Sequence, residues 1–105
     1  MTVDELFASM NDNFNASAAA GINAVFQFQF SDADNYHIVI KDSDKDIQKG
    51  DHETPTVTVS TDTATLLGVV SGTVNGMQAF MTGKLKAKGN MMLAQKLNTL
   101  FPMAQ

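Results

Sequence analysis

One stretch of alternating aromatic and amide side chains most constrains how this chain can fold. Phe26, Phe28 and Phe30 alternate with Gln27 and Gln29. This period of two is typical of a β-strand with one apolar and one polar face. An apolar face of three phenylalanines has to be covered by another layer of secondary structure. The sequence therefore predicts a sheet whose aromatic face is covered by helices.

Other segments supply the remaining strands and the covering helices. Four further strands are predicted at residues 36–41, 46–49, 56–60 and 84–88. Apolar spacing predicts helices from residue 3 to about 14, fading before residue 21, after residue 61 to Gly72, at 77–81 and from Asn90 to Pro102. Short turns make successive strands antiparallel. We therefore predict an α+β fold with a five-stranded, mainly antiparallel sheet covered by helices.

Helix ends are predicted from capping residues. Thr2 and Glu5 have the spacing of a capping box at the first helix. Ser60 or Thr61 is expected to cap the second helix, and Asn90 the last one.

Length and composition limit the domain organisation and the chemistry. A chain of 105 residues without repeats or linkers is expected to form a single domain, 1–105. It contains no cysteine, which excludes disulfides, thiolate metal ligands and cysteine nucleophiles. The formal net charge of −4 argues against nucleic-acid binding, which needs an excess of basic side chains.

An acidic cluster is the strongest candidate for a metal site. Counted from Asp42, carboxylates fall at positions 1, 3, 5 and 12 through Asp44, Asp46 and Glu53, which is the spacing of a calcium-binding EF-hand loop. That loop needs glycine at position 6, where this chain has Ile47, and it needs flanking helices where strands are predicted. A solvated hairpin turn explains the cluster, and no metal site is expected.

Catalytic and phosphate-binding motifs receive no support. Gly83-Lys84 is followed by leucine, whereas a phosphate-binding loop requires serine or threonine. His37 lies in a predicted strand and His52 in a polar loop, and no nucleophile elbow accompanies them. We expect no catalytic residue and no cofactor.

The last third of the chain has two features that residue spacing alone leaves ambiguous. Five of the seven methionines occur from Met77 onward, and methionine suits either an adaptable cavity wall or an ordinary core. Lys84, Lys86 and Lys88, with Lys96 later, form a positive strip. Such a strip either protects a sheet edge or binds anionic headgroups.

Specific runs of residues resemble the sterol carrier protein 2 domain. The run Gly-Lys-Leu-Lys-Ala-Lys-Gly-Asn-Met-Met-Leu-Ala-Gln-Lys-Leu at 83–97, with Gln-Ala-Phe-Met at 78–81, closely resembles that family. The strand 25–30 and the segment 55–62 match the same pattern, so the resemblance covers nearly the whole chain. It implies an apolar tunnel for sterols, fatty acyl chains or other lipids, enclosed by the sheet and helices, and no catalytic residue.

The resemblance also implies a set of lipid-binding residues. It places Gln78, Phe80 and Met81 beside the tunnel, and Leu93 and Leu97 on a helix that closes it. Periodicity adds sheet and helix positions, whereas Met91 is expected at the surface or rim. The complete predicted set is Phe28, Ile38, Leu67, Val70, Met77, Gln78, Phe80, Met81, Leu93, Leu97 and Phe101.

The function that the resemblance implies is non-catalytic binding and transfer or presentation of lipids. An accessory role in isoprenoid quinone biosynthesis and a non-binding dimerisation or interaction module remain alternatives. The expected partners are a lipid or fatty acyl ligand and, transiently, a membrane, with the protein a monomer or homodimer.

Targeting signals are the basis of the expected location. The chain starts with acidic residues, has no apolar run of about 18 residues, and ends Met103-Ala-Gln105 without a Ser-Lys-Leu-like peroxisomal signal. A cytoplasmic, free-standing domain of bacterial type is expected.

Overall fold

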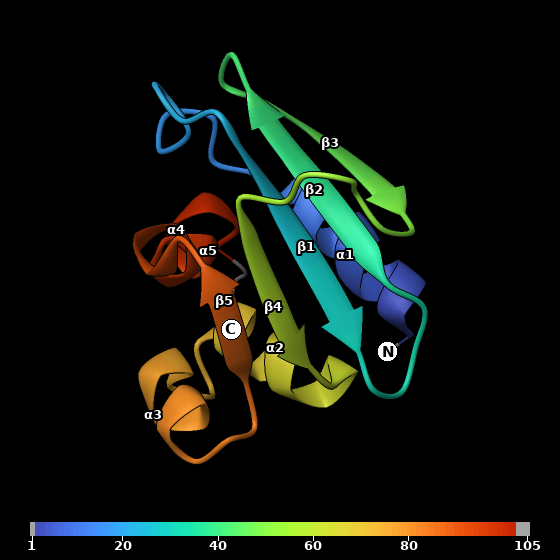
Figure 1. Ribbon diagram of the computed structural model, residues 1–105. Helices are drawn as coiled ribbons and strands as arrows, with labels where there is room; N and C mark the ends of the chain where they lie inside the picture. The colour runs from blue at the N-terminus through green and yellow to red at the C-terminus, as the bar shows by residue number, and fades with distance from the viewer. Residues whose placement is uncertain (1, 103–105) are drawn as a thin grey trace.

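The computed structural model (Figure 1) describes residues 2–102 and shows a sheet with helices packed on it. Met1 and residues 103–105, which include the C-terminal tripeptide considered above, lie outside the described part. The elements are α1 (Val3–Asp12), β1 (Ala24–Phe30), β2 (Tyr36–Lys41), β3 (Asp44–Lys49), β4 (Val57–Thr61), α2 (Thr63–Ser71), α3 (Gly76–Met81), β5 (Lys86–Gly89), α4 (Met91–Gln95) and α5 (Leu97–Leu100).

The five strands form one mixed sheet in the order β3-β2-β1-β4-β5. β1 runs parallel to β4, and the other neighbours are antiparallel. The predicted α+β class and the mainly antiparallel sheet are confirmed. The parallel pair arises because the chain after β3 crosses β2 and β1 before it enters β4, as Figure 1 shows.

The aromatic face of the sheet is the core, as the alternation predicts. Phe26 and Phe28 are fully buried, and Phe26 faces Ile38 on β2 and Val57 on β4. In Figure 1, α1 and α2 lie against this face of the sheet. Phe7 of α1 contacts Phe28 edge to face, with ring centroids 5.5 Å apart. Helix α1 therefore closes one half of the inner face.

The opposite face of the sheet carries a buried amide. It lies under residues 50–56, which cross the sheet between β3 and β4 and are called the crossing segment. Gln27 is almost fully buried; its Nε2 donates to the Asp51 carboxylate at 3.0 Å, and its Oε1 accepts from the backbone N–H of His52 at 2.7 Å. His37 Nδ1 lies 3.0 Å from the Gly50 carbonyl oxygen. His52 is therefore part of the crossing segment, and His37 and Gln27 contact that segment directly. Because both polar atoms of this buried amide have hydrogen-bond partners, those bonds offset the cost of removing it from water.

The helix ends show which capping predictions hold. The Thr2–Glu5 capping box is present at α1, but the helix ends at Asp12, and residues 16–21 form turns instead of a fading helix. The cap predicted for α2 was wrong. Strand β4 continues through Thr61, so Asp62 becomes the cap and accepts from the N–H of Thr65 at 2.7 Å.

The last third also differs from its predicted outline. The last strand is limited to Lys86–Gly89. The single final helix is two short ones, α4 and α5, joined at Lys96. The two helices differ in burial. Leu93 on α4 is only partly buried, whereas Leu97 and Leu100 on α5 are buried in the core.

A tyrosine–carboxylate hydrogen bond ties α1 to β2 and predicts a pH dependence. The Tyr36 hydroxyl donates to Asp4, which lowers the pKa of that carboxyl, while burial and this bond raise the pKa of Tyr36 to about 12. Protonated Tyr36 stabilises the fold fully below its ordinary pKa of 10.0, and this contribution is lost as the pH rises to about 12.

We therefore expect the free energy of unfolding to fall more steeply between these two pH values in the wild type than in Tyr36→Phe. Urea unfolding followed by circular dichroism measures both curves. Lysine titration affects both proteins alike, so equal slopes would contradict the coupling.

Candidate functional site

An apolar pocket of about 360 Å³ lies between the inner face of β4 and β5 and the helices of the last third. Its volume falls in the range of roughly 300–1,000 Å³ that small-molecule sites occupy. All of the lining residues except Gln95 are apolar. The lining consists of Val59, Val69, Gly76, Met77, Phe80, Leu85, Ala87, Met91, Ala94, Gln95 and Leu97.

The floor of the pocket belongs to the hydrophobic core of the domain. Val59 on β4 and Leu97 on α5 are 2% and 3% exposed. Val69 on α2 and Leu85, just before β5, are also buried. Each of these side chains packs into the core on one side and borders the pocket on the other. The floor is therefore held in place by the same packing that stabilises the fold.

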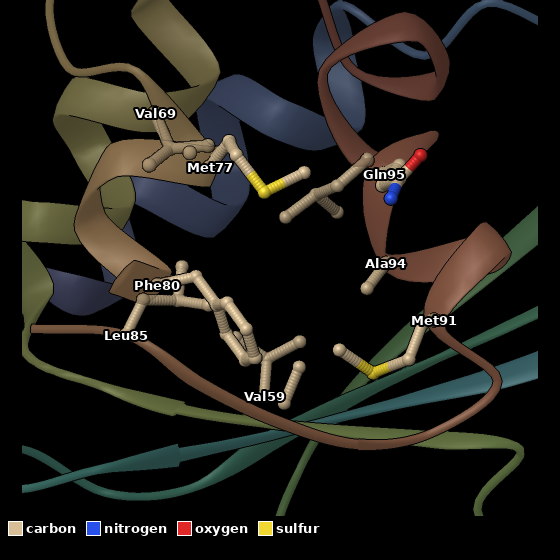
Figure 2. Close-up of a pocket in the computed structure, with 11 residues that line it drawn as sticks. Val59, Val69, Met77, Phe80, Leu85, Met91, Ala94 and Gln95 are labelled. Carbon is tan, nitrogen blue, oxygen red and sulfur yellow. The ribbon is translucent and has the colours of Figure 1, made fainter. Parts of the chain in front are cut away.

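The rim is formed by larger apolar side chains that solvent reaches. Met77, Phe80 and Met91 are 53%, 41% and 39% exposed. Figure 2 shows Met77 and Phe80 on α3 facing Met91 and Ala94 on α4 across the cavity. The pocket therefore opens between α3 and α4. Because methionine is unbranched, two of these three rim side chains can adapt to a guest molecule.

Capping side chains and one glycine position the two walls. Asn75 accepts from the N–H of Gln78 at 3.1 Å to begin α3, and Asn90 accepts from the N–H of Met92 at 3.1 Å to begin α4. Gly89 has φ +103, and a Cβ there would lie 2.5 Å from the Thr56 carbonyl oxygen. Glycine therefore permits the close turn from β5 into α4 beside β4.

Three of the predicted site residues, Met77, Phe80 and Leu97, line this pocket. Gln78 and Met81 belong to α3 but are exposed outside the lining, with Met81 78% exposed. The family resemblance indicated α3 as a wall, but it did not separate the side of this short helix that faces the pocket from the side that faces solvent.

The other predicted residues lie elsewhere in the domain. Phe28 packs against Phe7 of α1, and Phe101 packs against Phe14 with ring centroids 5.4 Å apart. Ile38 and Val70 are buried in the core, whereas Leu67 and Leu93 are partly buried against it. None of these six side chains borders the pocket.

Several lining residues were not predicted, although signals for some of them exist. Val59 alternates with Thr58 and Ser60, which indicates that it lies on the apolar face of its strand. Met91 was expected at the surface or rim. Met91 and Ala94 are three residues apart, so they share a face of α4. Val69 and Leu85 have no distinguishing signal, because their spacing is that of ordinary core residues.

The acidic turn between β2 and β3 lies across the sheet from the pocket. Asp42 and Ser43 form the tight turn between β2 and β3, with φ of 54° and 59°, and strands flank it on both sides. Within residues 2–102, three or more His, Asp or Glu side chains do not come together as a metal site. In the same range, no helix has the length and apolar character needed to cross a membrane.

The fold and the pocket define an α+β domain with an apolar pocket between its sheet and the helices of the last third. The chain belongs to the SCP-2 sterol transfer family, which matches residues 3–102. Hydroxysteroid dehydrogenase-like protein 2 from Xenopus laevis is 30% identical over 101 residues, covering 93% of this chain and 24% of the relative. The chain thus spans about a quarter of the length of the curated relatives it matches.

Solved structures share the fold. Sterol carrier protein 2 from Yarrowia lipolytica, in its apo form, is 25% identical with a TM-score of 0.72, over 91% of this chain and 86% of that one. Sterol carrier protein 2 from Aedes aegypti, in complex with palmitate, is 12% identical with a TM-score of 0.73 over all of both chains. The sec-alkylsulfatase Pisa1 from Pseudomonas sp. has a TM-score of 0.90 at 17% identity, covering all of this chain and 17% of that one.

Proposed function

We propose that this domain binds a lipid with a long apolar chain in the pocket and carries or presents it without chemical change. The observation that carries the proposal is the pocket itself, whose lining is apolar except for Gln95. The family and the palmitate complex of the Aedes aegypti relative support the same ligand class. Reacting groups that would modify a lipid are not among the lining residues.

Burial of the ligand's acyl chain supplies the binding affinity. Burial of each methylene contributes about 0.8 kcal/mol, so a sixteen-carbon chain like palmitate offers about 12 kcal/mol. Association costs of roughly 4–15 kcal/mol oppose this. The balance favours long chains over short ones. A specific headgroup pocket is therefore not required for useful binding.

The rim indicates how the ligand enters and where its head lies. The apolar chain would pass between α3 and α4 and lie on the floor formed by Val59 and Leu97. Met77, Phe80 and Met91 would then close over it, giving the enclosed site that the family resemblance implies. A polar head would remain at the mouth, in contact with solvent.

The proposal predicts that purified protein carries or accepts such lipids. Organic extraction followed by mass spectrometry identifies any bound chain, and titration of delipidated protein with palmitate tests acceptance. At a palmitate concentration 100 times the Kd, the free energy of unfolding should rise by about 2.7 kcal/mol. Butyrate is the matched control, because its few methylenes bury too little surface.

Each outcome of this test is informative. Fatty acyl chains in the extract, with stabilisation by palmitate, support a lipid carrier. Polyprenyl chains would instead support the accessory role in isoprenoid quinone biosynthesis. An empty extract with no stabilisation by palmitate would refute lipid binding and leave a non-binding interaction module.

A further inference from the structure

Charge is strongly segregated along this chain. Residues 1–62 carry three lysines against eleven carboxylate side chains, whereas residues 63–105 carry four lysines and no acidic side chain. The overall net charge of −4 conceals this division. The basic residues of the second part are Lys84, Lys86, Lys88 and Lys96, and all four are exposed. Within residues 2–102, the ion pairs that form all involve Lys49, on the edge strand β3.

The exposed apolar side chains occur in the same part of the chain. The large apolar residues that are exposed are Met77, Phe80, Met81, Met91 and Met92. All belong to α3 or α4, the two helices that flank the pocket mouth. Met81 and Met92 are 78% and 72% exposed and do not line the pocket. Neither packing in the core nor contact with a ligand in the pocket therefore accounts for these two exposed methionines.

Helices α3 and α4 and strand β5 lie together at one edge of the molecule, as Figure 1 shows. Lys86 and Lys88 are on β5, the edge strand, on the sheet face opposite to Ala87, which lines the pocket. Exposed methionines, lysines and the pocket mouth therefore lie along the same edge of the protein, with Lys86 and Lys88 projecting from the other face of the sheet at that edge. We call the part formed by residues 76–96 the mouth surface.

Helix α1 does not offer an equivalent surface. Its apolar residues Leu6, Phe7 and Met10 are 0–2% exposed because they pack into the core. Its outward side carries Asp4 and Glu5, which an anionic surface would repel. Docking through α1 would require this helix to leave the core.

We infer that the mouth surface docks on a membrane containing anionic lipids, with the pocket opening toward the bilayer. This inference rests on the proposed lipid binding, since it gives the ligand a direct path between bilayer and pocket. The lysines would attract the anionic headgroups, and Met81 and Met92 would enter the interface. The acidic remainder of the protein would point away from the membrane and so fix the orientation.

Vesicle co-sedimentation tests this inference. The protein should bind vesicles of phosphatidylcholine mixed with phosphatidylglycerol and should bind pure phosphatidylcholine much more weakly. Binding should weaken as salt is raised from about 0.1 M to 1 M, since the Debye length falls from about 10 Å to about 3 Å. Equal binding to both kinds of vesicle would overturn the inference.

Two variants locate the surface. Lys86→Gln/Lys88→Gln should lower the affinity for anionic vesicles about 30-fold, roughly fivefold for each lysine. Lys41→Gln/Lys45→Gln is the matched control, with the same charge change at the β2–β3 turn on the far edge of the sheet. The control should change the affinity less than about twofold. Equal losses in both would show that net charge alone decides and would overturn the assignment.

Met81→Ser/Met92→Ser tests the apolar contribution and separates docking from ligand binding. It should reduce vesicle binding severalfold, while palmitate affinity, measured without vesicles, stays at the wild-type value. Unchanged vesicle binding in this variant would overturn the part assigned to the methionines. A dimer in sedimentation velocity that these substitutions dissociate would assign the surface to a second copy and also overturn the inference. Failure of palmitate binding in the wild type would instead refute the proposed function.

Discussion

Phe80→Asp is expected to lower the affinity of the pocket for palmitate about 100-fold, or by about 3 kcal/mol. Phe80 lines the pocket beside Val59 and Leu85, and Figure 2 shows its ring directed into the cavity. A carboxylate there would lose water whenever an acyl chain occupied the pocket, and the apolar lining offers it no charged partner. The fold should persist, because Phe80 is 41% exposed.

Met81→Asp is the matched control for that substitution. The neighbouring side chain is 78% exposed and lies outside the pocket lining. It introduces the same charge on the same short helix without placing it against the ligand. We expect its palmitate affinity, measured by calorimetry without membranes, to stay within about twofold of the wild type. Equal effects of the two substitutions would show that the pocket is not where palmitate binds.

Phe28→Ala is expected to cost about 3–5 kcal/mol of unfolding free energy. Phe28 is fully buried, contacts Phe7 edge to face, and lies 6.4 Å from Phe30 between ring centroids. Its removal leaves a cavity between the sheet and α1. A domain of this size has about 5–15 kcal/mol in total, so the melting temperature should fall by roughly 15–30 °C.

A conservative change at the same position separates stability from ligand binding. Phe28→Leu retains much of the buried volume, so the protein should stay folded at room temperature. Because Phe28 packs under α1 and does not border the pocket, its palmitate affinity should equal that of the wild type. A large loss of affinity in folded Phe28→Leu would support the original expectation that this residue contacts lipid.

Local sequence patterns predicted the features of the fold that depend on neighbouring residues. The alternation of phenylalanine and glutamine in β1 predicted which face is buried, because side chains on a strand alternate between its two faces. The capping box at α1 was also predictable, since Thr2 and Glu5 interact within one turn. The parallel pairing of β1 with β4 was not, because it depends on where the segment after β3 crosses the sheet.

The alternation has one exception that depends on tertiary structure. Gln27 occupies the polar face of β1, where exposure is the usual expectation, yet it is 2% exposed. The crossing segment covers it and supplies hydrogen-bond partners from Asp51 and His52. Those residues lie more than twenty positions away in the chain, so the pattern within the strand carries no information about them.

The site shows the same division between local and distant information. The sequence by itself determined that the last third is rich in methionine, that α3 carries Met77 and Phe80, and that the chain resembles a lipid-binding family. Only the tertiary structure decided that Phe28, Ile38 and Val70 pack in the core, while Val59, Val69 and Leu85 border the pocket. The physical reason is that periodicity shows which side chains avoid water. Whether such a side chain meets another side chain or an open cavity depends on where distant elements place their surfaces.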